Sequence, residues 1–301
     1  MDQKTIKEYI RALEHMIAFL RTMLDEELKI PEKPETDRDA LTEFTELRML
    51  AKSDAWPPAI PEDMICGDDE DHKLARAAGI ASEFLKTNLT EKSFLDFGCG
   101  EGHTAYIAAS LLSRKKVFGY DLINQNWDHF EKVENLYFST DLQEVKQNGP
   151  YDIILLNDVL DHSKNPREVL EQIRELKAPH TGKIYLRCHP WTSRSGTHTY
   201  KQLNKAFLHL VFTETELQNV MGIKEVPAHK FIDPLNAYKS LIKDAGFSIV
   251  GENVVKQPVE LFFTTKSPIL RRIQECFSKN NFSEKFPRES MEIQFVDFIL
   301  V

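Results

Sequence analysis

Three glycines after a short apolar segment carry the clearest chemical signal in this sequence. The segment 93–97 contains Asp96, and Gly98, Gly100 and Gly102 follow it in G-x-G-x-G spacing. Glycine lets the backbone turn sharply and lets a ligand approach more closely than any Cβ allows. A carboxylate beside such a turn repels pyrophosphate and attracts a cationic ligand, such as an amino-acid ammonium group. The dinucleotide pattern G-x-G-x-x-G places its third glycine one residue later, so the spacing disfavours a nicotinamide-dependent oxidoreductase.

Three more polar residues stand where later apolar segments end. Asp121 ends the second segment, about twenty residues after the glycines. Asp141 follows the third segment, and Asn157 lies at the end of the fourth. Leu122, next to Asp121, either flanks a bound nucleoside or belongs to the core. Because ligands of open α/β sheets bind at the carboxyl ends of the strands, these residues are candidates for one binding site.

Three histidines near the same edge are candidates for a general base. His162 and His189 follow expected strand ends, and His198 lies in the insertion that comes next. Imidazole is the usual base at neutral pH, and the alternative for each ring is a structural, hydrogen-bonded histidine. A zinc site formed by Cys188, His189 and His198 would lack a convincing fourth ligand, so no metal site is predicted.

Four further side chains are candidates for binding an acceptor molecule. Arg187 and Arg194 flank the same edge, where a guanidinium either grips an anionic group in bidentate fashion or forms an internal salt bridge. Trp191 and Tyr200 either wall an acceptor pocket or pack the insertion onto the sheet.

Alternating strands and helices must position these residues. Apolar segments predict strands at residues 93–97, 116–121, 136–138, 151–156, 183–188, 247–255 and 293–301. Helical spacing predicts helices at residues 74–84, 103–113, 166–176, 235–245 and 268–277. The alternation predicts an α/β fold with a doubly wound, mostly parallel sheet and helices on both faces. Residues 189–232 interrupt it as a helical insertion whose helix carries Tyr200, Leu203, Phe207 and Leu210 on one face.

The residues before this alternation form two units. Residues 1–30 repeat apolar side chains in steps of four and three, which predicts an amphipathic helix that either packs on the parent domain or pairs with its copy in a homodimer. Prolines punctuate residues 31–73 and predict a linker with one short helix near 41–52. The alternation of strands and helices therefore begins at residue 74 and extends to residue 301.

Composition limits the class of protein. The chain has 301 residues, with 38 Lys and Arg against 47 Asp and Glu, and a formal net charge of −9. This acidic balance disfavours nucleic-acid binding, which draws on clustered cations. No apolar run approaches the roughly 18 residues of a membrane span, and no signal peptide is recognised. We therefore expect a cytoplasmic protein without a membrane partner.

The order of these motifs resembles that of the class I S-adenosylmethionine-dependent methyltransferases. The segment 96–102 resembles their first motif, an acidic residue followed by Gly-x-Gly-x-Gly. The resemblance implies that Asp121 binds the ribose and that Asp141 lies near the adenine amine. The segment 151–162 resembles the fourth-strand motif, with Asp161 and His162 in place of the usual Glu-His. The resemblance covers roughly residues 74–301 and is best in 93–188.

The resemblance implies a Rossmann-like sheet of seven strands and S-adenosylmethionine as the cofactor. We expect methyl transfer to an oxygen atom of a small-molecule acceptor, by in-line displacement with a histidine base. Two alternatives stay open: a nucleic-acid methyltransferase, and a non-catalytic scaffold that keeps the cofactor pocket and acts through its N-terminal helix.

Overall fold

The structure is a computed structural model, and it describes residues 37–65, 69–84, 92–111, 115–196, 198–223, 234–280 and 288–301. The predicted amphipathic helix 1–30, with its candidate dimer seam, lies outside the described residues. Within the part of the chain that the structure describes, no helix is both long enough and apolar enough to cross a bilayer.

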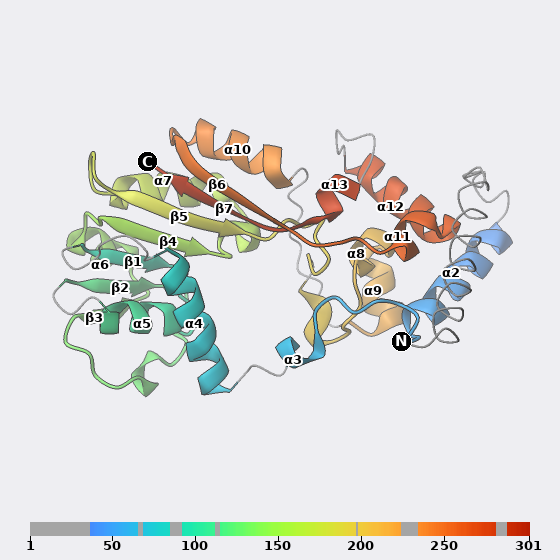
Figure 1. Ribbon diagram of the computed structural model, residues 1–301, viewed down its shortest axis with the longest axis horizontal. Coiled ribbons are helices and arrows are strands. Elements are labelled where there is room, and N and C mark those ends of the chain that lie inside the picture. Colours follow the sequence, from blue (N-terminus) through green and yellow to red (C-terminus); the bar gives the residue numbers. More distant parts are fainter. Residues whose placement is uncertain are drawn as a thin grey trace, which may run out of the picture.

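A seven-stranded sheet organises the larger lobe of the molecule (Figure 1). Its strands are β1 (Phe94–Phe97), β2 (Val117–Tyr120), β3 (Leu136–Ser139), β4 (Ile153–Asn157), β5 (Lys183–Cys188), β6 (Ile249–Lys256) and β7 (Ile293–Leu300). They lie in the order β3-β2-β1-β4-β5-β7-β6. The pairs from β3 to β5 are parallel, and β7 runs antiparallel to both of its neighbours. The predicted doubly wound, mostly parallel sheet is confirmed.

Helices cover both faces of this sheet because successive strand residues point to opposite sides. Leu95 of β1 and the apolar residues of the other strands on the same side of the sheet form one buried cluster. They pack there with apolar residues of α6 (Leu142–Asn148), α7 (Pro166–Leu176) and α10 (Pro234–Asp244). Phe94 and the apolar strand residues on the opposite side of the sheet form another cluster, with α4 (Glu70–Phe84) and α5 (His103–Leu111). The central strands β1, β2 and β4 are therefore buried on both sides, which explains their continuous apolar runs.

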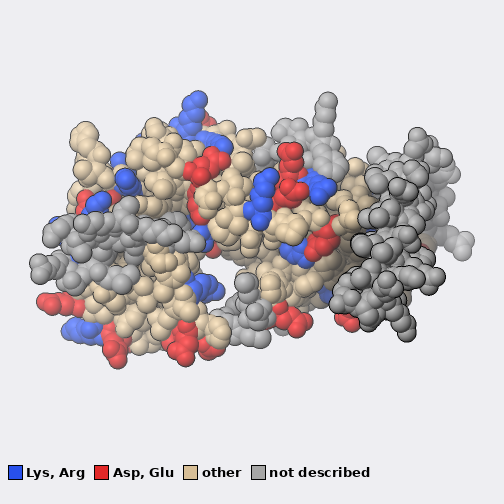
Figure 2. All heavy atoms as spheres, viewed as in Figure 1, with Lys and Arg blue, Asp and Glu red and all other residues tan. Residues whose placement is uncertain are grey.

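A second, helical lobe lies beside the sheet and has its own core. It contains α2 (Asp37–Ala51), α8 (Leu208–Val211), α9 (Glu214–Met221), α11 (Leu261–Thr265), α12 (Ser267–Lys279) and α13 (Arg288–Met291), with α3 (Glu62–Ile65) between the lobes in Figure 1. The segment around Trp56, expected to be linker, is part of this core. The Trp56 ring is buried there, and its Nε1 donates to the Ala206 carbonyl over 2.8 Å. Figure 2 shows the molecule hollowed between the two lobes.

The insertion after β5 does not contain the single helix that its apolar spacing predicts. A 3₁₀ turn at Thr199–Lys201 and the short helix α8 replace it. His198 and Phe207 adopt left-handed backbone conformations, with φ of 53° and 54°, immediately before these turns. A left-handed residue cannot continue a right-handed helix, so the segment breaks at both positions. Phe207 and Leu210 are buried as expected, but in one short turn: Phe207 is the N-cap of α8, which contains Leu210.

Candidate active site

A pocket of about 500 Å³ lies at the carboxyl ends of β1, β4 and β5. The strand order reverses direction between β1 and β4, and the crevice at such a reversal is where open α/β sheets bind their ligands. The loop after β1 and four residues of α4 line one part of the pocket. The ends of β4 and β5 and the start of the insertion line the other part.

The glycine loop after β1 turns sharply and leaves open space above it. Gly98 and Gly100 have φ of +77° and +53°, which side chains rarely adopt. A Cβ on Gly98 would lie 2.6 Å from Cγ2 of Val159, whereas a Cβ on Gly100 would meet nothing within 4 Å. The Gly98 N–H donates to the Tyr120 carbonyl over 2.7 Å and fixes the turn to the end of β2. Gly100 therefore presents bare backbone to the pocket, as the sequence predicts.

Asp96 lies beneath this loop as a buried carboxyl group. It is 3 % exposed, and its Oδ2 has no hydrogen-bond partner among the described residues. The pKa of Asp96 is raised to about 7: burial is the largest cause, the Ala105 N–H opposes it, and the neighbouring Asp121 carboxylate adds to the rise. A buried acid of this kind favours a cationic ligand, because a positive charge stabilises its ionised form. The residues present thus fit a cationic nucleoside.

The other predicted cofactor residues lie at the expected strand ends. Asp121 follows β2, and its Oδ2 accepts a hydrogen bond from the Gly100 N–H over 2.8 Å. Asp141 follows β3 and is the N-cap of α6, accepting from the Gln143 N–H over 2.8 Å. Leu122 is 80 % exposed, so it is not a core residue. Cofactor contacts by these three residues stay predictions.

The three predicted histidines all line the opposite part of the pocket. The rings of His162 and His198 are 4.8 Å apart, and those of His189 and His198 are 6.2 Å apart. Nδ1 of His189 bonds to Oδ1 of Asp158 over 2.5 Å. Burial lowers the pKa of His189, but the Asp158 carboxylate outweighs it and leaves that pKa above the ordinary value. Asp158 and His189 therefore form a charge-assisted pair.

Asp161 is a second buried carboxyl group beside these histidines. It is 4 % exposed, and neither of its oxygens has a hydrogen-bond partner among the described residues. Burial and the charge on Asp158 together raise its pKa to about 7, against smaller opposing effects of the His189 ring and of the backbone N–H groups of Asp161 and His189. Asp161 was predicted only as part of the fourth-strand motif, and no role was predicted for Asp158. The pattern Asp-x-x-Asp-His, which directly follows β4, could have indicated that both carboxyl groups belong to the site.

The comparisons with known proteins decide the family. A family model described as a methyltransferase domain matches residues 70–252. The chain belongs to the methyltransferase-domain family. This match confirms the resemblance to class I methyltransferases, and with the acidic Gly-x-Gly-x-Gly motif it identifies S-adenosylmethionine as the cofactor of this methyltransferase.

Solved structures with related folds include several methyltransferases. Coclaurine N-methyltransferase is 16 % identical, with 99 % of each chain covered and a TM-score of 0.48. A SAM-dependent methyltransferase from Archaeoglobus fulgidus is 18 % identical, covering 77 % of this chain and 94 % of that one, with a TM-score of 0.43. The plantazolicin methyltransferase BamL is 15 % identical, covering 88 % and 98 %, with a TM-score of 0.44. No curated protein sequence matches the chain.

The four predicted acceptor residues of the methyltransferase separate into two groups. Tyr200 and Arg187 line the pocket, and Arg187 forms a bidentate ion pair with Asp297, with N–O distances of 2.7 and 2.9 Å. Trp191 is instead buried in the core of the helical lobe. Arg194 forms an ion pair with Glu260. Neither lines the pocket, so the assignment of Trp191 and Arg194 to the acceptor is corrected: they hold the insertion in place.

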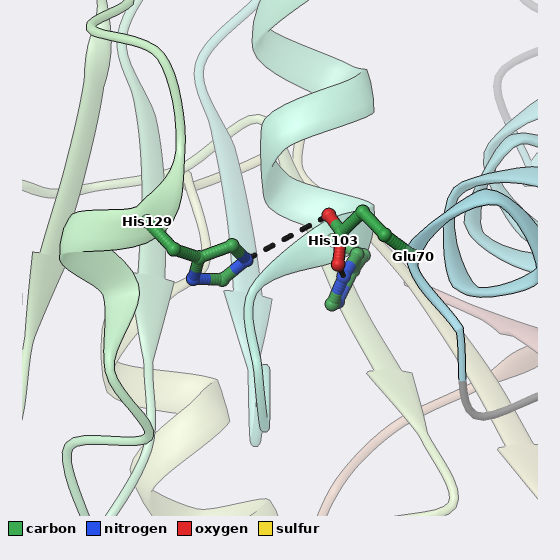
Figure 3. A group of neighbouring side chains, drawn as sticks. All are labelled: Glu70, His103 and His129. Carbon is green, nitrogen blue, oxygen red and sulfur yellow. Dashed lines mark hydrogen bonds and ion pairs between the residues drawn. The ribbon is translucent and has the colours of Figure 1, made fainter.

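A second cluster of ionisable side chains lies at the edge of the glycine loop and was not predicted from the sequence (Figure 3). His103, at the start of α5, bonds through Nε2 to Oε2 of Glu70 over 3.1 Å. His129, from the 3₁₀ turn Trp127–His129, places Nε2 3.8 Å from Oε1 of the same carboxylate. Glu70 begins α4, so this cluster links α4 to the segments around the loop. Glu70 is half exposed.

Proposed function

We propose that this methyltransferase transfers the methyl group of S-adenosylmethionine to an oxygen atom of a small-molecule acceptor. The observation that carries the proposal is one continuous pocket. It is lined at one end by the bare backbone of Gly100 and at the other by the Asp158–His189 pair and two more histidines. A methyl donor seated on the loop would face these imidazoles.

The residues proposed to hold the cofactor are Asp96, Gly98, Gly100, Gly102, Asp121, Leu122, Asp141 and Asn157. When bound, S-adenosylmethionine supplies a methyl group on a positively charged sulfur, which is already a strong electrophile. Asp96 would stabilise the positive charge of the ligand, and Asp121 would accept hydrogen bonds from its ribose. The main task left to the protein is therefore to orient the acceptor and to exclude water.

His189 is the proposed general base. Asp158 accepts the proton on Nδ1, which directs the lone pair of a neutral imidazole to Nε2. A hydroxyl acceptor would lose its proton to Nε2 as its oxygen attacks the methyl carbon. His162, His198 and Tyr200 would shape the acceptor end around this oxygen. An amine acceptor that is already neutral would not need such a base, so the pair favours oxygen.

Charge supports a small acceptor over a nucleic acid. The chain has a net charge of −9. On the face drawn in Figure 2, the described Lys and Arg side chains are interspersed with Asp and Glu. The guanidinium of Arg187, which lines the pocket, is neutralised by Asp297. Phosphate recognition along a strand draws on clustered, unneutralised cations instead.

The test uses S-adenosylmethionine with a radiolabelled methyl group and three matched acceptor sets: small alcohols, phenols and acids; small amines; and mixed RNA. We expect label in oxygen-bearing small molecules, and much less of it with the His189→Gln variant. Label only in amines or only in RNA, with well-folded protein, would overturn the proposed acceptor class.

A further inference from the structure

We propose that Asp161, His162 and His198 bind a divalent transition-metal ion at the acceptor end of the pocket. The proposal deepens the proposed function, on which it rests for the role of the ion. The ion itself is inferred from the side chains alone. One ligand atom from each of these three residues lies within 4.8 Å of the other two.

Small side-chain movements would complete such a site. Two donors at about 2.1 Å from one ion lie about 3.4 Å apart at a tetrahedral angle, so donors that lie within 4.8 Å of one another need to approach by at most about 1.4 Å. His162 can make this movement, because its side chain is 42 % exposed. Nε2 of His162 already lies 3.9 Å from Oδ2 of Asp161.

Asp161 supplies the independent evidence for a ligand. Its carboxyl group is almost completely buried, yet neither oxygen accepts a hydrogen bond from the described residues. Leaving a buried polar group without a partner is costly, and native structures rarely do so without a functional reason. A bound cation would satisfy both oxygens at once. The cluster is thus more than a group of neighbouring ionisable residues.

The donor set indicates which ions would bind. Two imidazoles and one carboxylate suit first-row divalent ions such as Mn²⁺, Fe²⁺, Co²⁺ and Zn²⁺, whereas Mg²⁺ and Ca²⁺ prefer oxygen ligands throughout. Three protein ligands leave at least one coordination position open, as in catalytic metal sites. Cys188, which the sequence offered as a zinc ligand, is buried in the core beside α10 and is not part of this group.

The position of the site in the pocket indicates what the ion would do in the reaction. His162 and His198 line the pocket, and the Asp158–His189 pair lies beside them. Asp158 and His198 both adopt left-handed backbone conformations, and such strain is found at functional sites. An acceptor hydroxyl in the open position would lose its proton more readily, and the proton would pass to His189. The oxygen then bonds to the methyl carbon, the carbon–sulfur bond breaks, and sulfur keeps the electron pair.

The Glu70 cluster of Figure 3 offers a similar donor set and serves as the internal control. Its carboxylate is half exposed, and Glu70 already has hydrogen-bond or ion-pair contacts with His103 and His129. It contains no buried carboxyl group without a partner. We therefore expect ion binding at Asp161 and not at Glu70.

The experiment measures Mn²⁺ binding to the chelator-treated full chain by electron paramagnetic resonance, with no cofactor present. We expect about one ion per chain, binding weakened at least about tenfold in Asp161→Asn and in His198→Ala, and binding within about twofold of the parent in His129→Ala. Thermal unfolding of every variant checks that it is folded. Asp161→Asn removes a buried acid without changing its shape, so we expect it to fold.

Two results would overturn the proposal: no Mn²⁺ binding by the folded parent chain, or binding that is lost in His129→Ala and retained in Asp161→Asn. Calorimetry with S-adenosylmethionine on the same samples separates this failure from failure of the proposed function. Cofactor binding without Mn²⁺ binding overturns the metal site alone. Mn²⁺ binding without cofactor binding overturns methyl transfer and leaves the metal site standing.

Discussion

The two ends of the pocket are built in different ways. The proposed cofactor end consists of one continuous loop whose backbone conformation requires glycine at Gly98 and Gly100. The proposed acceptor end is assembled from side chains on separate segments: the end of β4, the turn Leu160–His162, the end of β5 and the insertion. A backbone-built site tolerates few sequences, whereas a side-chain-built site can change its chemistry while the fold stays the same. The difference predicts that variants at one end should leave the function of the other intact.

The largest effect is expected at the acceptor end. His189→Ala removes the proposed base, and general-base catalysis contributes about 10²- to 10⁴-fold to rate, so turnover should fall by at least about 100-fold. Calorimetry should show that the affinity for S-adenosylmethionine changes little. Equal losses of turnover and cofactor affinity would instead mean that the two ends are not separate.

The next largest effect is expected at the cofactor end. Asp121→Ala removes the proposed ribose acceptor and the carboxylate that holds the Gly100 N–H. Losing hydrogen bonds to a charged group should weaken cofactor binding by about 3 kcal/mol, or about 100-fold, as measured by calorimetry. Asp128→Ala, an exposed carboxylate in the next turn, is the matched control and should bind within about twofold of the parent. A similar loss in both variants would point to general electrostatics.

The buried acid beneath the loop predicts a pH dependence. The pKa of Asp96 is raised to about 7, so the group is uncharged in the free protein below that pH. A cationic ligand favours the ionised form, so affinity for S-adenosylmethionine should rise by about tenfold between pH 5.5 and 7.5 and then level off. Asp96→Asn should flatten this rise.

The raised pKa of Asp96 also makes the stability of the folded chain depend on pH: stability falls over a pH range in which the affinity for the cofactor rises. Because its folded pKa lies above the ordinary value, the stability that Asp96 contributes is present at low pH and is lost as the pH rises through about 7. The melting temperature of the free chain should therefore fall between about pH 4 and pH 7 by more than that of Asp96→Asn. A parent and variant with parallel melting curves would contradict the raised pKa.

The smallest effect is expected at Asp141, where two substitutions test whether the side chain acts as a helix cap. Its side chain caps α6, so Asp141→Ala should lower the free energy of unfolding by about 1 kcal/mol, whereas Asp141→Asn should retain the cap. Urea denaturation measures both. If Asp141→Asn is as unstable as Asp141→Ala, the hydrogen bond to the Gln143 N–H does not act as a cap.

The sequence predicted the sheet and the glycine loop because both depend on local patterns. The strand at 183–188 has the predicted bounds, and the predicted glycines take up left-handed conformations. The helical lobe was not predicted, because Trp56, Phe207 and Phe263 come from segments far apart in sequence and meet only in the folded chain. Asp158 was missed for a related reason: its partner, His189, follows a different strand, β5. Trp191 showed how an aromatic residue near a site can belong to the core instead.

Calorimetric titration of the folded full chain with S-adenosylmethionine tests the central claim most directly. The account predicts one binding event per chain, which Asp121→Ala weakens and His189→Ala leaves nearly unchanged. A chain that melts cooperatively, yet releases no heat and gains no thermal stability with S-adenosylmethionine or S-adenosylhomocysteine, would contradict it.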